Sequence, residues 1–209
     1  MTWYRNDDGI YTRHEPPGHQ LHGDLDLGLT TEDMTRYDAH HEAGHAVLGL
    51  LKGMPVRRAT LEPNDLHSAH VEFGPWSSLP WWSYALMMAA GDRAGDRWLR
   101  EAGLWTPQRA WIAERGCDSD RRKVAETVPG PSVVIFGALP AGAQPQQGVA
   151  HYQSLQDEVD FWLDMYWPSV QKLANAMTEF RELSSHQISD VTGIALTQAA
   201  VPVSTEGEA

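Results

Sequence analysis

Residues 37–47, YDAHHEAGHAV, contain the pattern His-Glu-x-x-His, with His41, Glu42 and His45 at its fixed positions. Two histidines four residues apart lie on the same face of a helix, so both imidazoles can hold one metal ion. Glu42 follows the first histidine and can take a proton from a water molecule that the metal acidifies. The stretch therefore predicts a helix that carries a metal-dependent hydrolytic site.

The sequence on either side indicates the length of this helix. It should begin at Thr30 or Thr31, because Glu32 and Asp33 then lie in its first turn, where negative charge is stabilising. Gly53 follows Lys52 and offers a C-terminal stop. Gly44, inside the helix, indicates a close approach by another backbone.

Several further elements can be placed from the sequence. A second helix should run from Trp81 to about Ala102, and the small residues at its centre would let another helix pack closely. Two short alternating segments should pair as strands. These strands are residues 58–61 and 70–73. A third helix should begin at Asp120 with Ser119 as its cap, and a long helix should cover residues 154–181 with a kink or a split at Pro168. A short last helix should begin with a capping box at Ser184 and end at Gly193.

These elements predict an α+β fold that is mainly α-helical: a helical bundle around the HExxH helix, with a small β-hairpin or strand pair. We expect one domain over residues 30–193. Residues 1–29 are rich in Gly, Pro, His and Asp and predict a flexible N-terminal arm. Residues 129–150 predict a flexible loop, and residues 194–209 a disordered tail.

Composition narrows the partners and the compartment. Lys and Arg number 16 against 28 Asp and Glu, a net charge of −12 that repels nucleic acid and anionic membranes. The N-terminus lacks the apolar run of a signal peptide, and no window approaches the length of a membrane span. One cysteine, Cys117, cannot form an internal disulfide, which favours the cytoplasm. The oligomeric state stays open, a homo-oligomer included.

A catalytic zinc site needs three protein ligands and an open position, so another residue must join the two histidines. A metzincin would have a third histidine at position 51, where this chain has Leu51, so that class is excluded. A thermolysin-like site would take a glutamate from a later helix, and Glu101 and Glu114 are candidates for it.

Residues 37–47 resemble the opening of the peptidase domain of the FtsH family, the ATP-dependent membrane metalloproteases. Other stretches are similar to segments of that domain in the same order, and together the resemblance covers about residues 31–193. They are residues 55–63, like its first strand; 90–96, like its Gly-Arg-Ala-Ala-Glu helix; 116–121, like the glycine-to-aspartate turn with its third zinc ligand; and 167–174 with 182–184, like its closing helices.

The resemblance implies that Zn²⁺ is held by His41, His45 and Asp120, with Glu42 as the general base. Asp120 is also the physically sensible third ligand, because a helix start stabilises its carboxylate as the anion a metal needs. Asp118 and Asp96 are the rivals. For Asp96 we favour a supporting role, in which it accepts the free N–H of a histidine.

The chain also departs from that family. It has no G-x-x-x-x-G-K-[ST] phosphate loop and no membrane segment, and it reads Asp96-Arg97 where the family has glutamate. We therefore expect an ATP-independent zinc metallopeptidase that hydrolyses unfolded or extended protein segments, held by addition to the strand pair. Two alternatives remain: a catalytically silent metal-binding regulatory or adaptor module, and a zinc amidohydrolase acting on a small amide.

Other histidines and the cysteine have simpler interpretations. His40 points about 100° away from His41 and is expected to be packed or hydrogen-bonded. Cys117 is expected to be a small, half-buried residue rather than a thiol that masks the metal. His14, His19 and His22 fit a polar arm better than a metal chelate.

Overall fold

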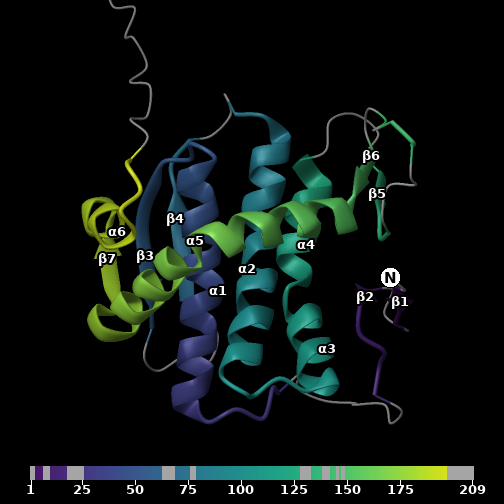
Figure 1. Cartoon of the computed structure of the whole chain (residues 1–209), viewed down its shortest axis with the longest axis horizontal. Coiled ribbons are helices and arrows are strands. Elements are labelled where there is room, and N and C mark those ends of the chain that lie inside the picture. Colours follow the sequence, from purple (N-terminus) through teal and green to yellow (C-terminus); the bar gives the residue numbers. More distant parts are fainter. Residues whose placement is uncertain are drawn as a thin grey trace, which may run out of the picture.

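A computed structural model describes residues 3–6, 10–17, 26–62, 69–75, 79–127, 133–137, 142–144, 146 and 149–196. These residues form a mainly helical α+β fold with three small sheets, which confirms the predicted fold class (Figure 1). Helices α1 (Thr31–Leu51) and α2 (Trp81–Glu101) lie side by side. The long helix α5 (Tyr152–Phe180) crosses both of them.

Helix α1 forms where the sequence predicted it. Thr30 caps its N-terminus, because the hydroxyl oxygen accepts the backbone N–H of Asp33 at 3.1 Å. Most of the helix from Ala39 to Leu50 is buried, since α2, α5 and the sheet each cover part of it. A helix enclosed on several sides has no polar face, and α1 is therefore the central element of the core.

Small residues on α2 let it approach α1 closely. A Cβ atom at Gly44 would lie 2.6 Å from Cβ of Ala94 and 2.7 Å from the carbonyl oxygen of Ala90. Real Cβ atoms do not come so close, so the predicted close approach at Gly44 is confirmed. The His-Glu-x-x-His pattern therefore packs against backbone and methyl groups of α2.

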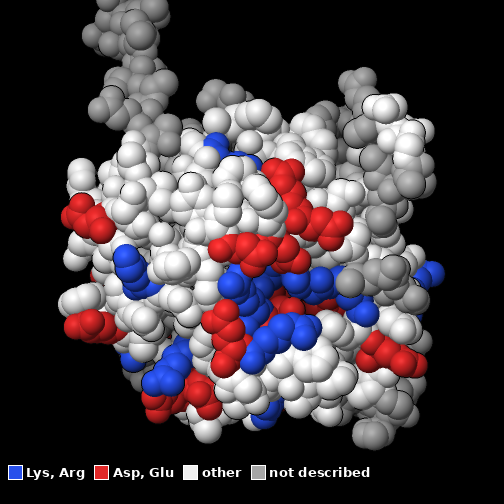
Figure 2. Space-filling model, viewed as in Figure 1, with Lys and Arg blue, Asp and Glu red and all other residues white. Residues whose placement is uncertain are grey.

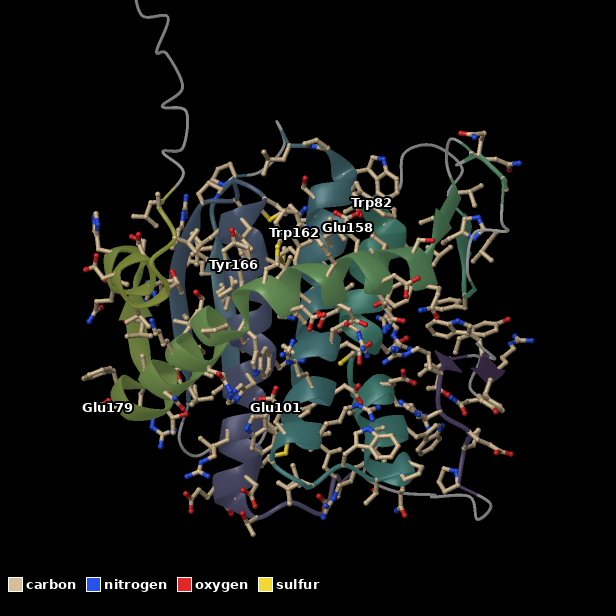
Figure 3. The ribbon with its side chains drawn as sticks, in the orientation of Figure 1. Trp82, Glu101, Glu158, Trp162, Tyr166 and Glu179 are labelled. Atoms are coloured by element: carbon tan, nitrogen blue, oxygen red, sulfur yellow. The ribbon has the colours of Figure 1, made fainter. Side chains whose placement is uncertain are left out.

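Helix α5 covers α1 and α2, and it continues through Pro168, so of the predicted kink or split the split does not occur. Glu158 links it to α2, since its carboxylate accepts the indole N–H of Trp82 at 2.8 Å; the same carboxylate accepts that of Trp162, on α5 itself, at 3.3 Å (Figure 3). Arg93 pairs with Asp160 at 2.6 Å, and Arg97 with Asp164 at 2.8 Å. Figure 2 shows acidic and basic side chains interspersed at the centre of this face.

A three-stranded antiparallel sheet packs beside α1, in the order β4-β3-β7. Strand β3 (Val56–Leu61) pairs with β4 (Ala69–Phe73), so the two predicted strands form with slightly wider bounds. Strand β7 (Glu182–Ser184) was not predicted, and it pairs with β3 on the other side. Helix α6 (Ser185–Thr192) then begins with the predicted capping box and ends at Gly193 in the left-handed conformation.

Two helices, rather than the single predicted helix, form the region around Asp120, the residue expected as the third ligand. Helix α3 (Pro107–Gly116) was missed, although Thr106 caps it and proline begins it. Helix α4 begins at Asp118 rather than at Asp120 and ends at Thr127, so Ser119 is inside the helix and is not its cap. Asp120 nevertheless stays in the first turn, where its negative charge is stabilised.

The described part of residues 1–29 corrects the prediction of a loose arm. Strands β1 (Tyr4–Arg5) and β2 (Tyr11–Thr12) pair with each other, and Arg13 forms an ion pair with Glu114 of α3 at 2.7 Å. Within residues 129–150, β5 (Val133–Ile135) and β6 (Val149–His151) pair in parallel, so that segment is more than a flexible loop. The described residues of the N-terminal segment thus contact α3, and those of the second segment form a two-stranded sheet.

Of the predicted tail, residues 194–196 follow α6, and Ile194 and Leu196 pack against the core. The rest of the tail, residues 197–209, lies outside the described residues. Among the helices that the structure describes, none combines the length and the apolar content needed to cross a bilayer.

Candidate metal centre

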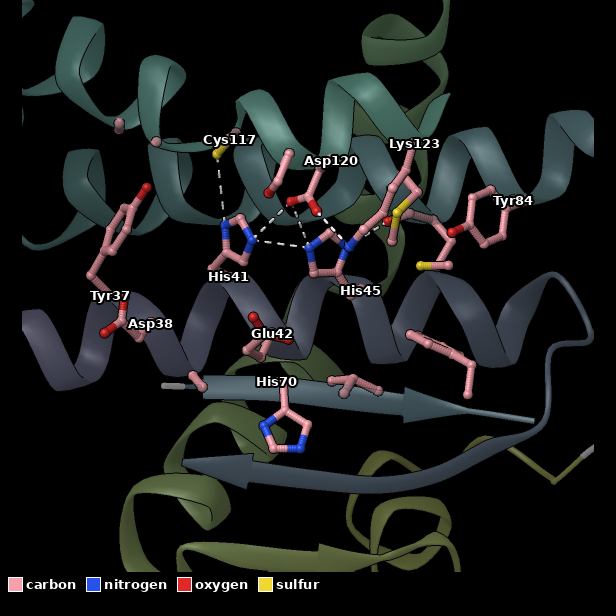
Figure 4. A pocket seen from close by; sticks show the side chains of 18 of the residues that line it. Tyr37, Asp38, His41, Glu42, His45, His70, Tyr84, Cys117, Asp120 and Lys123 are labelled. Carbon is pink, nitrogen blue, oxygen red and sulfur yellow. Dashed lines mark hydrogen bonds and ion pairs between the residues drawn. The ribbon is translucent and has the colours of Figure 1, made fainter. Parts of the chain in front are cut away.

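Two histidines of α1 and one aspartate of α4 meet at a single point between the helices (Figure 4). The Nε2 atoms of His41 and His45 are 3.0 Å apart. Oδ2 of Asp120 lies 3.3 Å from Nε2 of His41 and 3.2 Å from Nε2 of His45. Three potential donor atoms thus form a nearly equilateral triangle, and the structure brings together all three residues predicted as ligands.

The backbone of α2 fixes the orientation of His45. Nδ1 of His45 lies 2.7 Å from the carbonyl oxygen of Met87, and in the tautomer that donates this hydrogen bond Nε2 carries the lone pair. Gly91, one turn further along α2, lies against both rings: a Cβ there would clash with Nε2 of His45 and lie 2.6 Å from Nε2 of His41. The imidazoles are therefore held from one side by a hydrogen bond and from another by a bare backbone.

Glu42 lies beside the triangle rather than in it. Its carboxylate is within 4.8 Å of the imidazole nitrogens, so by distance alone it could also be a ligand. As the next residue along the helix from His41, however, it points about 100° away, to the side of α1 that faces β4 (Figure 4). Asp120 is the better third ligand, because one of its oxygens is close to both Nε2 atoms.

The charges of the site are strongly coupled. Burial opposes a charge on His45, but the adjacent carboxylate of Asp120 outweighs it and raises the pKa of His45 to about 9. Burial also opposes the charge of Asp120, yet His45 and His41 hold the pKa of Asp120 well below its usual range. Burial raises the pKa of Glu42 by more than the two histidines lower it. Without a metal, the site is thus a buried ion pair next to a carboxylate that binds protons more readily than usual.

A cavity of about 910 Å³ opens over these residues. The helices that carry the triangle form part of its wall, and strand β4 contributes Ala69, His70, Val71 and Phe73. Two polar groups in the wall were not singled out from the sequence: Tyr84, and Lys123, whose ammonium lies 3.6 Å from Oδ1 of Asp120. Lys123 could have been inferred from the sequence, because residues three apart on a helix, such as Asp120 and Lys123, are neighbours on its surface.

The rival ligands are engaged elsewhere. Asp96 accepts hydrogen bonds from Arg100 at 3.0 Å and from the indole of Trp105 at 2.9 Å, so the predicted contact with a histidine is wrong; the backbone of Met87 has that role. Asp118 pairs with Arg122 at 2.7 Å. Of the two glutamates considered, Glu101 accepts the indole N–H of Trp167 and Glu114 binds Arg13.

The nearby histidines and the cysteine can also be placed. Nδ1 of His40 lies 2.7 Å from the carbonyl oxygen of Arg36, and the ring stacks on Trp98. His40 is therefore packed and hydrogen-bonded, as predicted. Cys117 is buried rather than half-buried, and its Sγ lies 4.0 Å from Nδ1 of His41, the nitrogen that faces away from the triangle. Burial raises the pKa of the Cys117 thiol well above its usual range.

His14 packs edge-on against Trp105. His19 and His22 lie outside the described residues.

In comparisons with known proteins, no family model matches this chain and no curated protein matches it. The assignment of a function therefore rests on the geometry of the site.

Proposed function

We propose that this protein is a zinc-dependent metallopeptidase that hydrolyses peptide bonds in unfolded or extended protein segments without ATP. The observation that carries the proposal is the triangle of His41 Nε2, His45 Nε2 and Asp120 Oδ2, with edges of 3.0, 3.2 and 3.3 Å. Ligand atoms ~2.0 Å from a tetrahedral ion lie ~3.3 Å from one another. The donor atoms are thus already spaced for such an ion.

The chemistry of the donors supports zinc in particular. Two imidazoles and one carboxylate form a borderline-soft set, and three protein ligands leave a fourth position for a substrate or water. Bound zinc would act as a Lewis acid and lower the pKa of water at that position. The resemblance of residues 31–193 to the FtsH peptidase domain implies the same ligand set.

Glu42 is the proposed general base. Its carboxylate lies next to the ligands, and its raised pKa means that it takes up a proton more readily than an exposed glutamate would. The same group can then give the proton to the leaving amine. Lys123, half exposed beside Asp120, adds a positive charge at the cavity wall.

Strand β4 supports a peptide substrate. It lies at the edge of the sheet among the described residues and lines the cavity beside α1 (Figure 4). An edge strand offers unpaired backbone groups, so an extended segment can add to it as a further strand. Folded proteins rarely expose such a segment, which accounts for the proposed preference. We place the reaction in the cytoplasm, since a single cysteine cannot form an internal disulfide.

The test is hydrolysis of fluorescent casein by purified protein loaded with one zinc ion per chain. The change Glu42→Gln keeps the size of the side chain and removes the base, which lowers rates by ~10² to 10⁴ in comparable enzymes. We expect this variant to bind zinc as the wild type does and to show no detectable cleavage. Equal rates for the two proteins would exclude Glu42 as the base.

A second candidate is hydrolysis of a small amide, because a cavity of about 910 Å³ is within the range of small-molecule sites. The same preparations can be tested on short acyl amides. Cleavage of these with none of casein would favour the amidohydrolase, and zinc binding with neither activity would favour a regulatory module.

A further inference from the structure

A buried cluster of four charged side chains lies behind the metal triangle and takes no part in the proposed chemistry. It consists of Arg13 beside β2, Asp92 of α2, Glu114 of α3 and Arg121 of α4. Their side chains are between 2% and 7% exposed. Two positive and two negative charges make the cluster neutral, as burial at this depth requires.

The links of the cluster run from the N-terminal segment to α4. Nε and the backbone N–H of Arg13 each donate to the carboxylate of Glu114 at 2.7 Å. Glu114 Oε1 lies 3.9 Å from Nη2 of Arg121, and Arg121 also donates to the carbonyl oxygen of Tyr11. Residues 11–14, which we call the N-terminal strap, therefore bind both α3 and α4.

The other end of the cluster reaches α2. Nη2 of Arg121 donates to Oδ2 of Asp92 at 3.3 Å, and Gln156 of α5 donates to the same oxygen at 3.1 Å. Both residues of the Arg121–Asp92 pair are next in sequence to residues of the proposed metal site. Arg121 directly follows Asp120, and Asp92 directly follows Gly91, the residue against which both imidazoles lie.

We propose that the N-terminal strap positions the metal site: Arg13, acting through Glu114 and Arg121, holds α4 so that Asp120 completes the triangle with His41 and His45. The inference rests on the proposed metal site. Without Arg13, Glu114 becomes a buried carboxylate that has lost its main partner, and Arg121 becomes the nearest cation that can turn toward it. Such a shift would move the first turn of α4, and Asp120 with it, away from the imidazoles.

The test compares two arginines that both bind the N-terminal region. Arg13→Ala removes the guanidinium from the cluster and leaves residue 13 only its backbone N–H to bind Glu114. Arg109→Ala is the matched control, because Arg109 donates to the carbonyl oxygens of Leu27 and Gly28, both at 2.9 Å, without entering the cluster. Zinc affinity is measured by competition with a chromogenic chelator, and the visible absorption of Co²⁺-loaded protein reports the geometry around the metal.

We expect Arg13→Ala to weaken zinc binding by at least about tenfold, because mutation of residues that support metal ligands typically lowers metal affinity by that much. The visible spectrum of the Co²⁺-loaded variant should also change. Arg109→Ala should change zinc affinity by less than about threefold and leave the spectrum as it is, even if both variants melt at the same lower temperature. Arg13→Lys keeps the positive charge that Arg13→Ala removes, and should have an affinity between those of wild type and Arg13→Ala. If Arg13→Ala does not fold, the comparison of Arg13→Lys with the wild type tests the inference.

Wild-type affinity and spectrum in both Arg13 variants would overturn the inference and leave the proposed function intact. Equal losses in Arg13→Ala and Arg109→Ala would also overturn it, since a general loss of stability would then explain the effect. A wild-type protein that binds neither zinc nor cobalt would refute the proposed function itself, and this inference with it.

Discussion

Gly91→Ala should damage the metal site more than it damages the fold. The added methyl group would clash with Nε2 of His45 and lie 2.6 Å from Nε2 of His41, the two nitrogens proposed to bind zinc. In the metal-free protein the rings can tilt away, and alanine makes the helix itself more stable than glycine does, by about 1 kcal/mol. Zinc binding would force the rings back against the methyl group.

Overpacking of this kind costs about 1–3 kcal/mol, and each 1.4 kcal/mol is a factor of ten in affinity, so zinc should bind about 5- to 150-fold more weakly. The metal-free protein should unfold within about 1 kcal/mol of the wild type, because the helix gain offsets the remaining strain. Chelator competition and urea unfolding measure the two quantities. Gly116→Ala is the control, because a Cβ at that position meets nothing within 4 Å. Unchanged zinc affinity in Gly91→Ala would refute the placement of the imidazoles against α2.

Asp120→Asn should lower zinc affinity by more than about tenfold while Asp118→Asn leaves it unchanged, as measured by chelator competition; the opposite order would make Asp118 the ligand. Metal-free protein should lose up to about 3 kcal/mol of stability as the pH rises from 6.5 to 9, because His45 keeps its proton in the folded protein up to its raised pKa of about 9 but loses it near 6.5 when unfolded, so that folding must take up a proton at a growing cost. Urea unfolding with a chelator present checks this, and a flat profile would argue against a charged His45. Gly44→Ala should destabilise the protein with or without zinc, by up to about 2 kcal/mol after the helix gain, because its methyl meets the backbone of Ala90; a higher urea midpoint would contradict the close packing of α1 and α2.

The proposed histidine ligands could be paired from the sequence, because a spacing of four residues places His41 and His45 on one helix face whatever surrounds them. Asp120 was implied by the family resemblance, and it stays near a helix start even though α4 begins two residues earlier than predicted. The supporting contacts were not accessible in this way. Met87 holds His45 through a backbone carbonyl, a group that every residue type has, so no sequence pattern indicates it.

The N-terminal segment shows the same limit at a larger scale. Its Gly, Pro and His content is typical of a loose arm, but Arg13 finds its partner 101 residues away in the chain. Strand β7 was missed for a related reason, since three residues are too few for a period and only pairing with β3 makes Glu182–Ser184 a strand. The sequence predicts elements with local periods well, and it predicts poorly those that depend on distant partners.

The long separation between the strap and its partners also sets an order of folding. During synthesis, α1 with both histidines emerges long before α4 with Asp120, so a nascent chain would offer a metal only two of the three proposed ligands. The strap is made first, but it has nothing to bind until Glu114 and Arg121 have followed. Contacts between residues so far apart form slowly, because a long loop must close first. We therefore expect the N-terminus to dock late, after the helices have assembled, and the proposed zinc site to bind tightly only at the end of folding.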